Sequence, residues 1–286
     1  MNWQQWLAQA VFRLRVSHSP SAKRDAEILL AQVTGVTRTH LLAFGETSLT
    51  TAQHTTLEAL LVRREQGEPI AYLIGEREFW SLPLRVSSDT LIPRPETECL
   101  VQCALNLLSP DRAEVLDLGT GSGAIALALA SERPAWRITG IDRLHGAVEL
   151  ARDNAVRLGL KNVQFHEDNW FKSLQAKRYN LIVSNPPYIE VEDPHLMQGD
   201  VRFEPRSALV SMQNGLQDLA AICRGAEAHL ESGGWLILEH GWRQGAAVRG
   251  LLASAGFDRI VTLRDYGNNE RVSQGRVHQR KRNRRY

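Results

Sequence analysis

The amino-acid sequence predicts a doubly wound α/β domain that follows a small domain made only of helices. Residues 1–75 place apolar side chains at helical spacing and show no strand pattern. From residue 114 onward, short apolar runs alternate with longer helical stretches, which is typical of a parallel sheet covered by helices. A glycine-rich loop, Gly119 to Gly123, stands between one such run and the helix after it. The 286-residue chain is long enough for both domains.

Helical periodicity begins at the first residues of the chain. Apolar residues recur three, four and seven positions apart over residues 3–14, 22–33 and 57–61. We therefore expect a helical bundle over residues 1–75. Residues 76–95 then carry Phe, Trp, Leu and Val interrupted by prolines, which predicts an extended or hairpin connector between the two domains.

The α/β domain is expected over residues 96–277. Its first helix begins near Pro95, because proline suits the first turn of a helix. The expected strands cover residues 114–118, 137–141, 163–166, 179–183, 234–239 and 260–263. The other expected helices cover residues 124–130, 147–158, 216–230 and 245–255. This alternation predicts parallel strands joined by crossover helices on both faces of one sheet.

Composition argues against several classes of protein. The 34 basic and 32 acidic side chains give a formal charge of +2, so no overall field favours wrapping nucleic acid or binding a membrane. No apolar run approaches the roughly 18 residues of a membrane span, and the start of the chain lacks a signal-peptide pattern. We therefore expect a cytoplasmic protein. The basic residues 278–286 show no apolar pattern, so we expect them to form a disordered tail.

The cysteines do not predict a metal site or a disulfide framework. Cys99, Cys103 and Cys223 are an odd number of cysteines and contain no C-x-x-C pair. We expect them to be small buried side chains, and we expect no bound metal.

The glycine loop predicts a nucleotide-like ligand. Its glycines let the backbone approach a ligand closely, at the point where a parallel sheet has its ligand crevice. Asp142 ends the next expected strand and can accept two hydrogen bonds from a ribose diol, although capping the following helix is an alternative role. Asp117, which precedes the loop, could receive an ammonium group or cap the amides of the loop. Dinucleotides and S-adenosylmethionine both carry the diol, so the loop by itself allows either ligand.

The motif Asn185-Pro186-Pro187-Tyr188, at the end of the strand expected over 179–183, distinguishes these ligands. Two prolines end the strand and leave the Pro186 carbonyl free to accept a hydrogen bond. The Asn185 amide oxygen is a second acceptor. Two converging acceptors can hold the N–H groups of a carboxamide or an exocyclic amine and orient its lone pair, while Tyr188 lies against the planar group. Hydride transfer needs a proton donor or a metal near a carbonyl instead, so the motif favours methyl transfer from S-adenosyl-L-methionine.

Such a transfer needs no nucleophilic side chain, because the sulfonium methyl group is already activated. Positioning and polarisation by the two acceptors can lower the barrier, and we expect an in-line displacement with the spare proton lost to water.

The sequence resembles the release-factor glutamine N5-methyltransferases, the PrmC/HemK family, over nearly the whole chain. Besides the two motifs above, the resemblance is carried by REFWSLPLRV at 77–86, LIPRPETE at 91–98, GDVRFEP at 199–205 and DYGNNERV at 265–272. It implies a Rossmann-like class I methyltransferase domain and an N-terminal helical domain that recognises the release factor. The implied reaction is methylation of the glutamine in the Gly-Gly-Gln motif of class-1 peptide chain release factors, with no stable nucleic-acid partner.

The resemblance also implies roles for individual residues. The implied cofactor-binding residues are Gly119, Thr120, Gly121, Ser122, Gly123, Asp142, Trp170 and Asn185. The implied catalytic residues are Asn185, Pro186 and Tyr188, and the implied substrate-binding residues are these three and Pro187. One position departs from the family, which usually has an acidic residue directly before position 170. Asn169 stands there, with Asp168 one place earlier, and this difference affects the expected contacts to adenine.

Three other functions are compatible with parts of the sequence. An adenine N6-methyltransferase acting on nucleic acid could use the same motif, but it must flip a base and hold phosphates, and the sequence lacks a large insert or a basic stripe before its tail. A noncatalytic adaptor has no need for an intact Asn185 and Tyr188. An NAD-dependent dehydrogenase has no need for the four-residue motif at all.

Overall fold

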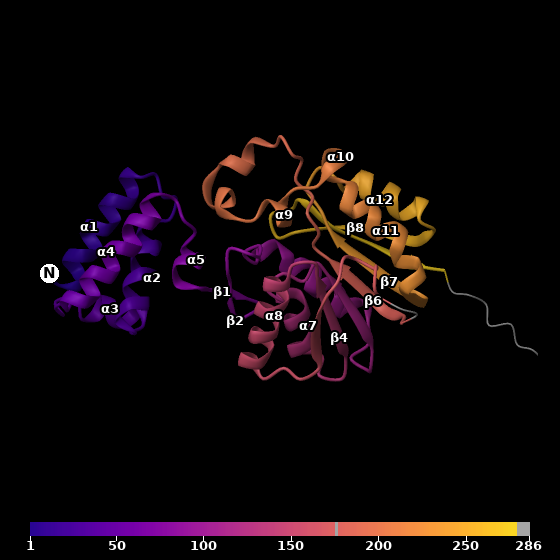
Figure 1. Cartoon of the computed structure of the whole chain (residues 1–286), viewed down its shortest axis with the longest axis horizontal. Helices are drawn as coiled ribbons and strands as arrows, with labels where there is room; N and C mark the ends of the chain where they lie inside the picture. The colour runs from indigo at the N-terminus through magenta and orange to yellow at the C-terminus, as the bar shows by residue number, and fades with distance from the viewer. Residues whose placement is uncertain (175–176, 279–286) are drawn as a thin grey trace, which may run out of the picture. The chain divides into compact units, whose positions relative to one another are not determined.

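The computed structural model describes residues 1–174 and 177–278, and the chain divides into two compact units (Figure 1). The first unit contains Met1–Glu76 together with Pro194–Phe203. The second contains Arg77–Asp193 and the described residues from Glu204 onward. The basic tail expected over 278–286 lies outside the described residues, apart from His278.

The first unit is helical. Its helices are α1 (Trp3–Val16), α2 (Ala22–Thr34), α3 (Arg38–Ala43), α4 (Thr51–Glu65) and α5 (Ile70–Ile74). Capping boxes begin α1, at Asn2 and Gln5, and α4, at Thr50 and Gln53, and so satisfy amides that lack partners within the helix. The apolar spacing seen in the sequence falls on α1, α2 and α4, whose buried side chains form the core. The short helices α3 and α5 were not predicted.

A segment from the α/β half of the sequence completes this helical unit. It comprises the 3-10 helices η2 (Pro194–Met197) and η3 (Gly199–Phe203). The Arg64 guanidinium on α4 pairs with Asp25 on α2 at 2.8 Å and with Asp200 of this segment at 3.0 Å. The side chains of Arg64 and Asp25 are only 5% and 3% exposed, so the pair is shielded from water. No pattern in the sequence predicts this excursion of the chain.

The second unit begins with a hairpin and a helix. Strands β1 (Glu76–Phe79) and β2 (Leu82–Arg85) pair through a tight turn at Trp80 and Ser81, both of which have positive φ. A 3-10 turn, η1 (Pro95–Thr97), then leads into α6 (Glu98–Leu107).

A seven-stranded sheet forms the centre of the second unit, with strand order β5-β4-β3-β6-β7-β9-β8. The strands are β3 (Glu114–Leu118), β4 (Arg137–Asp142), β5 (Val163–Glu167), β6 (Tyr179–Ser184), β7 (Leu230–Glu239), β8 (Phe257–Arg264) and β9 (Glu270–Val277). The five strands from β5 to β7 are parallel, and β9 runs antiparallel to both β7 and β8. The predicted doubly wound α/β fold is confirmed.

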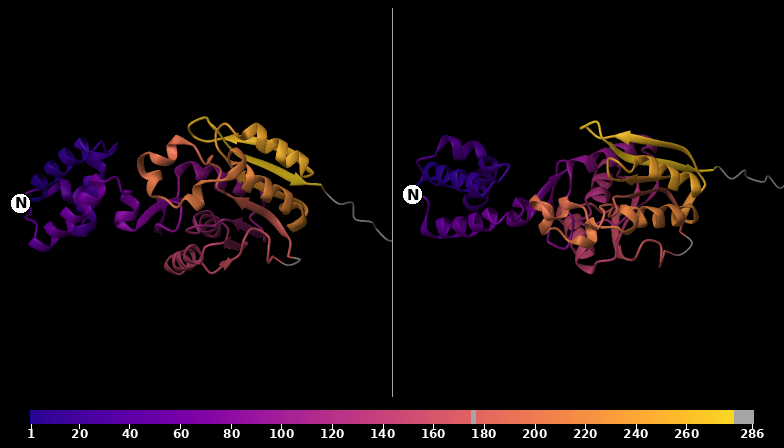
Figure 2. Two further views of the ribbon diagram at one scale, coloured as in Figure 1. Left: turned by 45° about the horizontal axis from the view of Figure 1, so that its top comes forward. Right: turned by 90° about the horizontal axis from the view of Figure 1, so that it is seen from above.

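Helices cover both faces of this sheet, as can be followed in Figure 2. Alternate strand residues such as Val115 pack against α6, α7 (Ala124–Glu132) and α8 (His145–Leu158). Their neighbours, such as Leu116, pack against α11 (Gln217–His229) and α12 (Gly245–Ser254) on the other face. The central strands β3 and β6 are therefore buried on both sides, whereas the edge strand β5 has only Phe165 buried.

Two parts of the sheet differ from the prediction. Strand β7 begins at Leu230 rather than residue 234, and β9 was missed altogether. Two short helices, α9 (Arg206–Leu209) and α10 (Met212–Gly215), also lie where none was expected. Within residues 1–174 and 177–278, no helix combines the length and apolar character needed to cross a membrane.

Candidate active site

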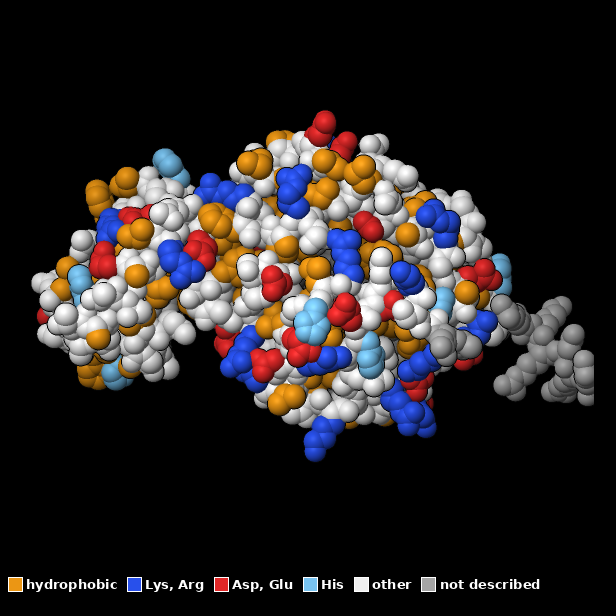
Figure 3. Space-filling model, viewed as in Figure 1, with side chains coloured by type: hydrophobic (Ala, Val, Ile, Leu, Met, Phe, Trp, Pro, Cys, Tyr) orange, Lys and Arg blue, Asp and Glu red, His pale blue; other side chains and the backbone are white. Residues whose placement is uncertain are grey.

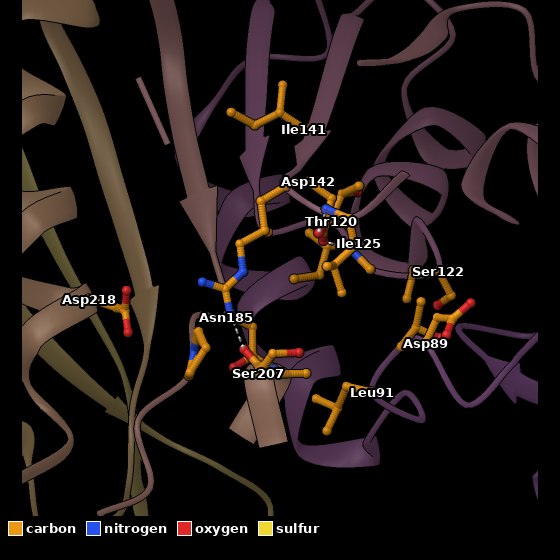
Figure 4. Close-up of a pocket in the computed structure, with 18 of the residues that line it drawn as sticks. Asp89, Leu91, Thr120, Ser122, Ile125, Ile141, Asp142, Asn185, Ser207 and Asp218 are labelled. Atoms are coloured by element: carbon orange, nitrogen blue, oxygen red, sulfur yellow. Dashed lines mark hydrogen bonds between the residues drawn. The ribbon is translucent and has the colours of Figure 1, made fainter. Parts of the chain in front are cut away.

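A pocket opens at the carboxyl ends of β3, β4 and β6 (Figure 4). Strands β3 and β6 are neighbours, and Leu118 lies opposite Ser184. After β3 the chain forms β4 and β5 on one side of β3, and it later returns to form β6 on the other side. The loops that follow β3 and β6 therefore run in opposite directions and leave a crevice between them. The glycine loop follows Leu118 directly, and Asn185 follows Ser184 directly, so the topology places the two sequence motifs side by side.

Most of the residues expected at the site line this pocket. Those that line it are Gly119, Thr120, Gly121, Ser122, Asp142, Trp170, Asn185 and Pro187. Gly123, Pro186 and Tyr188 do not. Gly123 caps α7 with a φ of +85°, and a Cβ there would lie only 3.0 to 3.2 Å from the side chains of Leu127, Phe165 and Ala151. Because Gly123 has no side chain, α7 and α8 can pack closely against the sheet.

Asp142 ties the glycine loop to the start of α8. One carboxylate oxygen accepts a hydrogen bond from the Gly121 amide at 3.0 Å, and the other accepts from the Leu144 amide at 3.0 Å. The N-cap residue of α8 is Leu144, so Asp142 is not itself the helix cap. A carboxylate offers about four acceptor positions. Asp142 therefore keeps acceptor capacity for a ligand in the pocket that it lines (Figure 4).

Trp170 forms an aromatic wall over the glycine loop. It has a φ of +52°, and its ring lies 3.5 Å from the position that a Cβ on Gly119 would occupy. The Asp168 carboxylate stabilises this turn, because it accepts hydrogen bonds from the Asn169 amide at 2.7 Å and from the Ser173 amide. Asp168 and Asn169 both line the pocket, so the departure from the family pattern lies beside Trp170 in space as well as in sequence.

Asp117 stabilises the glycine loop through a hydrogen bond. It is fully buried, does not line the pocket, and accepts a hydrogen bond from the Thr120 hydroxyl at 2.7 Å. Burial raises the pKa of this carboxyl to about 7. Thr120 thus stands between Asp117 and the pocket, and Asp117 orders the loop.

The Asn185-Pro186-Pro187-Tyr188 motif forms the opposite wall. The Asn185 side-chain nitrogen donates to the Thr97 hydroxyl at 3.2 Å, which leaves the amide oxygen of Asn185 as an acceptor. None of the hydrogen bonds found among the described residues ends on the carbonyl of Pro186. Tyr188 is not among the residues that line the pocket, and its hydroxyl donates to Glu239 at 3.1 Å.

Several polar residues at this site were not identified from the sequence. Thr97 and Arg271 lie within the blocks LIPRPETE and DYGNNERV, whose individual side chains were given no roles. Glu239 ends β7 as Asp142 ends β4, and an acidic residue closing an apolar strand is the signal that could have revealed it. Asp218, in the first turn of α11, also lines the pocket (Figure 4). Acidic residues are common in first helical turns, so its position gave no distinct signal.

A buried carboxylate joins two of the sequence blocks. Glu204, from GDVRFEP, accepts a hydrogen bond from the Ile92 amide at 2.9 Å and pairs with the guanidinium of Arg94, both from LIPRPETE. Arg94 lines the pocket. The contact explains why two distant stretches belong to one site. Among the described residues, no group of three or more His, Cys, Asp and Glu side chains is arranged to hold a metal ion.

Two family models match the chain. The model described as the PrmC N-terminal domain matches residues 5–75, and the model described as the methyltransferase small domain matches residues 95–199.

Curated relatives match almost the whole chain. A release factor glutamine methyltransferase of Salmonella typhimurium is 57% identical over 96% of this chain and 99% of its own length. The protein of the same name from Escherichia coli K12 is 56% identical over 98% of this chain and 100% of its own length. A third, from Yersinia pestis, is 58% identical over 96% of this chain and 99% of its own length.

Two solved structures share the fold over most of the chain. A methyltransferase from Pyrococcus furiosus aligns with a TM-score of 0.54 and 16% identity, over 77% of this chain and 98% of that chain. The 16S rRNA N2 G1207 methyltransferase of T. thermophilus, solved with AdoMet and guanosine, aligns with a TM-score of 0.52 and 20% identity, over 71% and 50% of the two chains. At these identities the likeness shows the fold alone.

Proposed function

The chain belongs to the family of release factor glutamine methyltransferases, and from this premise we propose that it methylates the side-chain amide nitrogen (N5) of the glutamine in the Gly-Gly-Gln motif of class-1 peptide chain release factors. The proposed methyl donor is S-adenosylmethionine. The observation that carries the proposal is the position of Asn185, in the wall of the pocket beside the glycine loop, with its amide oxygen left as an acceptor.

The lining of the pocket fits S-adenosylmethionine. Asp142 would accept hydrogen bonds from the ribose hydroxyls, and Trp170 would border the adenine. The backbone of Gly119 and Gly121 permits close approach, because neither residue has a side chain of its own. When bound, the cofactor supplies a methyl group on a positively charged sulfur.

The residues of the chain position the nitrogen that accepts this methyl group. The carboxamide of a glutamine has two N–H donors, which the Asn185 amide oxygen and the Pro186 carbonyl would accept. This arrangement directs the weak lone pair of the nitrogen towards the methyl carbon. A new N–C bond forms as the S–C bond breaks, the electron pair of that bond returns to sulfur, and one amide proton passes to water.

The alternative function, methylation of adenine in nucleic acid, is not favoured. The full-length relatives carry the name release factor glutamine methyltransferase. The face of the molecule in Figure 3 intersperses Lys and Arg with Asp and Glu instead of presenting a basic stripe. A phosphate backbone is bound by clustered basic side chains.

A labelling experiment tests the proposed function. The full-length protein is incubated with methyl-labelled S-adenosylmethionine and either a class-1 release factor or duplex DNA, and the label is located by mass spectrometry. We expect label on the glutamine of the Gly-Gly-Gln motif and none on DNA. Label on adenine, or no label on the release factor, would refute the proposal.

Replacing the carboxylate of Asp142 should weaken cofactor binding. In Asp142→Ala the ribose loses charge-assisted hydrogen bonds, and the Gly121 amide loses its anchor. We expect the Kd for S-adenosylmethionine, measured by calorimetry, to rise about tenfold to a hundredfold. Asp153→Ala, which removes an exposed carboxylate from α8, is the matched control and should leave the Kd unchanged. An unaltered Kd in Asp142→Ala would show that the ribose is held elsewhere.

A further inference from the structure

Residues 204–211, which include α9, border the cofactor pocket and are held in place at three points. We call this segment the strap. Ser207 and Ala208 of the strap line the pocket, and so does Arg143, which follows Asp142. The Arg143 guanidinium donates a hydrogen bond to the Ser207 carbonyl at 3.1 Å, marked by the dashed line at Ser207 in Figure 4. Resting on the proposed function, we propose that Arg143 is a latch whose hydrogen bond keeps the strap closed and so controls the entry and release of S-adenosylmethionine.

The two ends of the strap are firmly attached to the second unit. At its start, the buried Glu204 carboxylate accepts a hydrogen bond from the Ile92 amide at 2.9 Å and also pairs with a guanidinium. At its end, the Ile189 amide donates to the Leu209 carbonyl at 2.9 Å, and the Ser211 amide donates to the Ile189 carbonyl at 3.0 Å. Ile189 directly follows the four-residue motif after β6, so this end of the strap is fixed to the substrate side of the site.

The contact with Arg143 is the exposed one of the three. The Arg143 side chain is exposed, and the Ser207 carbonyl is the one hydrogen-bond partner found for it among the described residues. Water competes for such a bond, so its net contribution is small. The middle of the strap can therefore open while both ends stay attached.

The strand order explains why this bond crosses the pocket. Arg143 follows β4, whereas the end of the strap is bonded to the chain that follows β6. Strand β3 lies between β4 and β6, and the glycine loop follows β3. The bond from Arg143 to the strap therefore spans the place where the glycine loop and Asp142 would hold the cofactor. A bound cofactor is enclosed while this bond is formed, and it can leave when the bond breaks.

A latch and a direct cofactor ligand differ in their effect on binding kinetics. The latch joins two parts of the chain and includes no atom of the cofactor, so it can form in both the free and the loaded protein. Its loss raises the open fraction of both states, and so it raises the rate constants of association and dissociation together. The loss of a side chain that bound the cofactor directly would raise the dissociation rate constant alone.

Binding kinetics of Arg143→Met provide the first test, because methionine keeps most of the side-chain length and removes the donors. Tryptophan fluorescence after rapid mixing with S-adenosylmethionine gives the association rate constant. Displacement of labelled cofactor by an unlabelled excess gives the dissociation rate constant. We expect both constants to rise about fivefold and the Kd to change less than about twofold.

Arg112→Met is the matched control for these rate constants. It removes an exposed guanidinium from the loop before β3, outside the pocket lining, and should leave both constants unchanged. If only the dissociation rate constant rose in Arg143→Met, Arg143 would be a direct cofactor ligand. If neither constant changed, the strap would not be held by Arg143. Either result would overturn the proposal.

Hydrogen exchange of the protein alone provides a second test. Within the strap, the Ala208 amide donates to the Pro205 carbonyl at 2.9 Å and the Val210 amide to the Arg206 carbonyl at 2.8 Å. A single helical turn depends on tertiary contacts, so both amides should exchange about fivefold faster in Arg143→Met. Arg143→Lys can still donate and should lie between this variant and wild type. Exchange at the wild-type rate in Arg143→Met would contradict the latch.

These results can be separated from a failure of the proposed function. If the wild-type protein binds no S-adenosylmethionine, the proposed methyl donor is wrong. If it binds the cofactor but does not methylate a release factor, the proposed substrate is wrong, and the rate constants still decide the role of Arg143. If it does both, and Arg143→Met binds the cofactor at wild-type rates, only the latch is wrong.

Discussion

Asn185→Ala should lower the rate of methyl transfer about a hundredfold or more, since a loss near 3 kcal/mol in transition-state stabilisation corresponds to that factor. The substitution removes one of two proposed acceptors for the glutamine amide and leaves the glycine loop and Asp142 in place. Affinity for S-adenosylmethionine should fall only modestly. Single-turnover rates with saturating release factor isolate this step from binding.

Two further variants sharpen the test at Asn185. Asn185→Asp retains acceptor oxygens but adds a negative charge near the sulfonium. This charge would stabilise the bound cofactor before transfer, and the positive charge of the sulfur is lost during transfer. Turnover should therefore also be impaired. Asn106→Ala, on the exposed side of α6, is the matched control and should react at the wild-type rate. A near wild-type rate for Asn185→Ala would remove the main support for an amide clamp.

Arg64→Met should destabilise the helical unit by about 3 to 5 kcal/mol, because it leaves the carboxylate of Asp25 buried without its cationic partner. The adjacent Arg63 gives a matched control on the same helix. Arg63 pairs with Glu68, and the two side chains are 49% and 23% exposed. Arg63→Met should therefore lower the free energy of unfolding by less than about 1 kcal/mol.

Hydrogen exchange in α2 and α4 measures this effect in the helical unit alone. We expect Arg64→Met to speed exchange there by more than a hundredfold, which is what a loss of about 3 kcal/mol implies, and Arg63→Met to change it little. Similar exchange in the two variants would mean that the two serine hydroxyls bound to Asp25 compensate for the missing guanidinium.

The sequence predicted the central strands of the sheet and parts of both edge strands, β5 and β8. β3 and β6 are rich in apolar residues because helices cover them on both sides. Strand β9 gave no such signal, since its buried positions include Ser273 and Gly275 as well as two valines. Its place between β7 and β8 is set by pairing with strands distant in sequence, a long-range effect that local pattern does not contain.

At the site, the sequence identified the glycine loop, Asp142, Trp170 and the motif after β6, but it gave no role to Arg94, Thr97 or Asp218, which also line the pocket. The glycine loop and Asn185 could be recognised because their residue types are unusual where an apolar strand ends. Thr97 has no unusual context, and its importance arises only from its contact with Asn185, 88 residues away. The contact of Tyr188 with the planar group of the substrate stays a prediction, and its hydroxyl donates to Glu239.

The interleaving of the two units constrains how the protein is made on the ribosome. Asp200, which completes the environment of Arg64, is 136 residues further along the chain. By the time it is translated, β3 to β6 have already been synthesised, while β7, β8 and β9 have not. The helical unit therefore cannot reach its final form as soon as residues 1–76 are made, as an N-terminal domain ordinarily would, but all of its residues are made before the sheet is complete. We expect the helical unit to wait for residues 194–203, and the sheet to be completed last, when β7, β8 and β9 have been made.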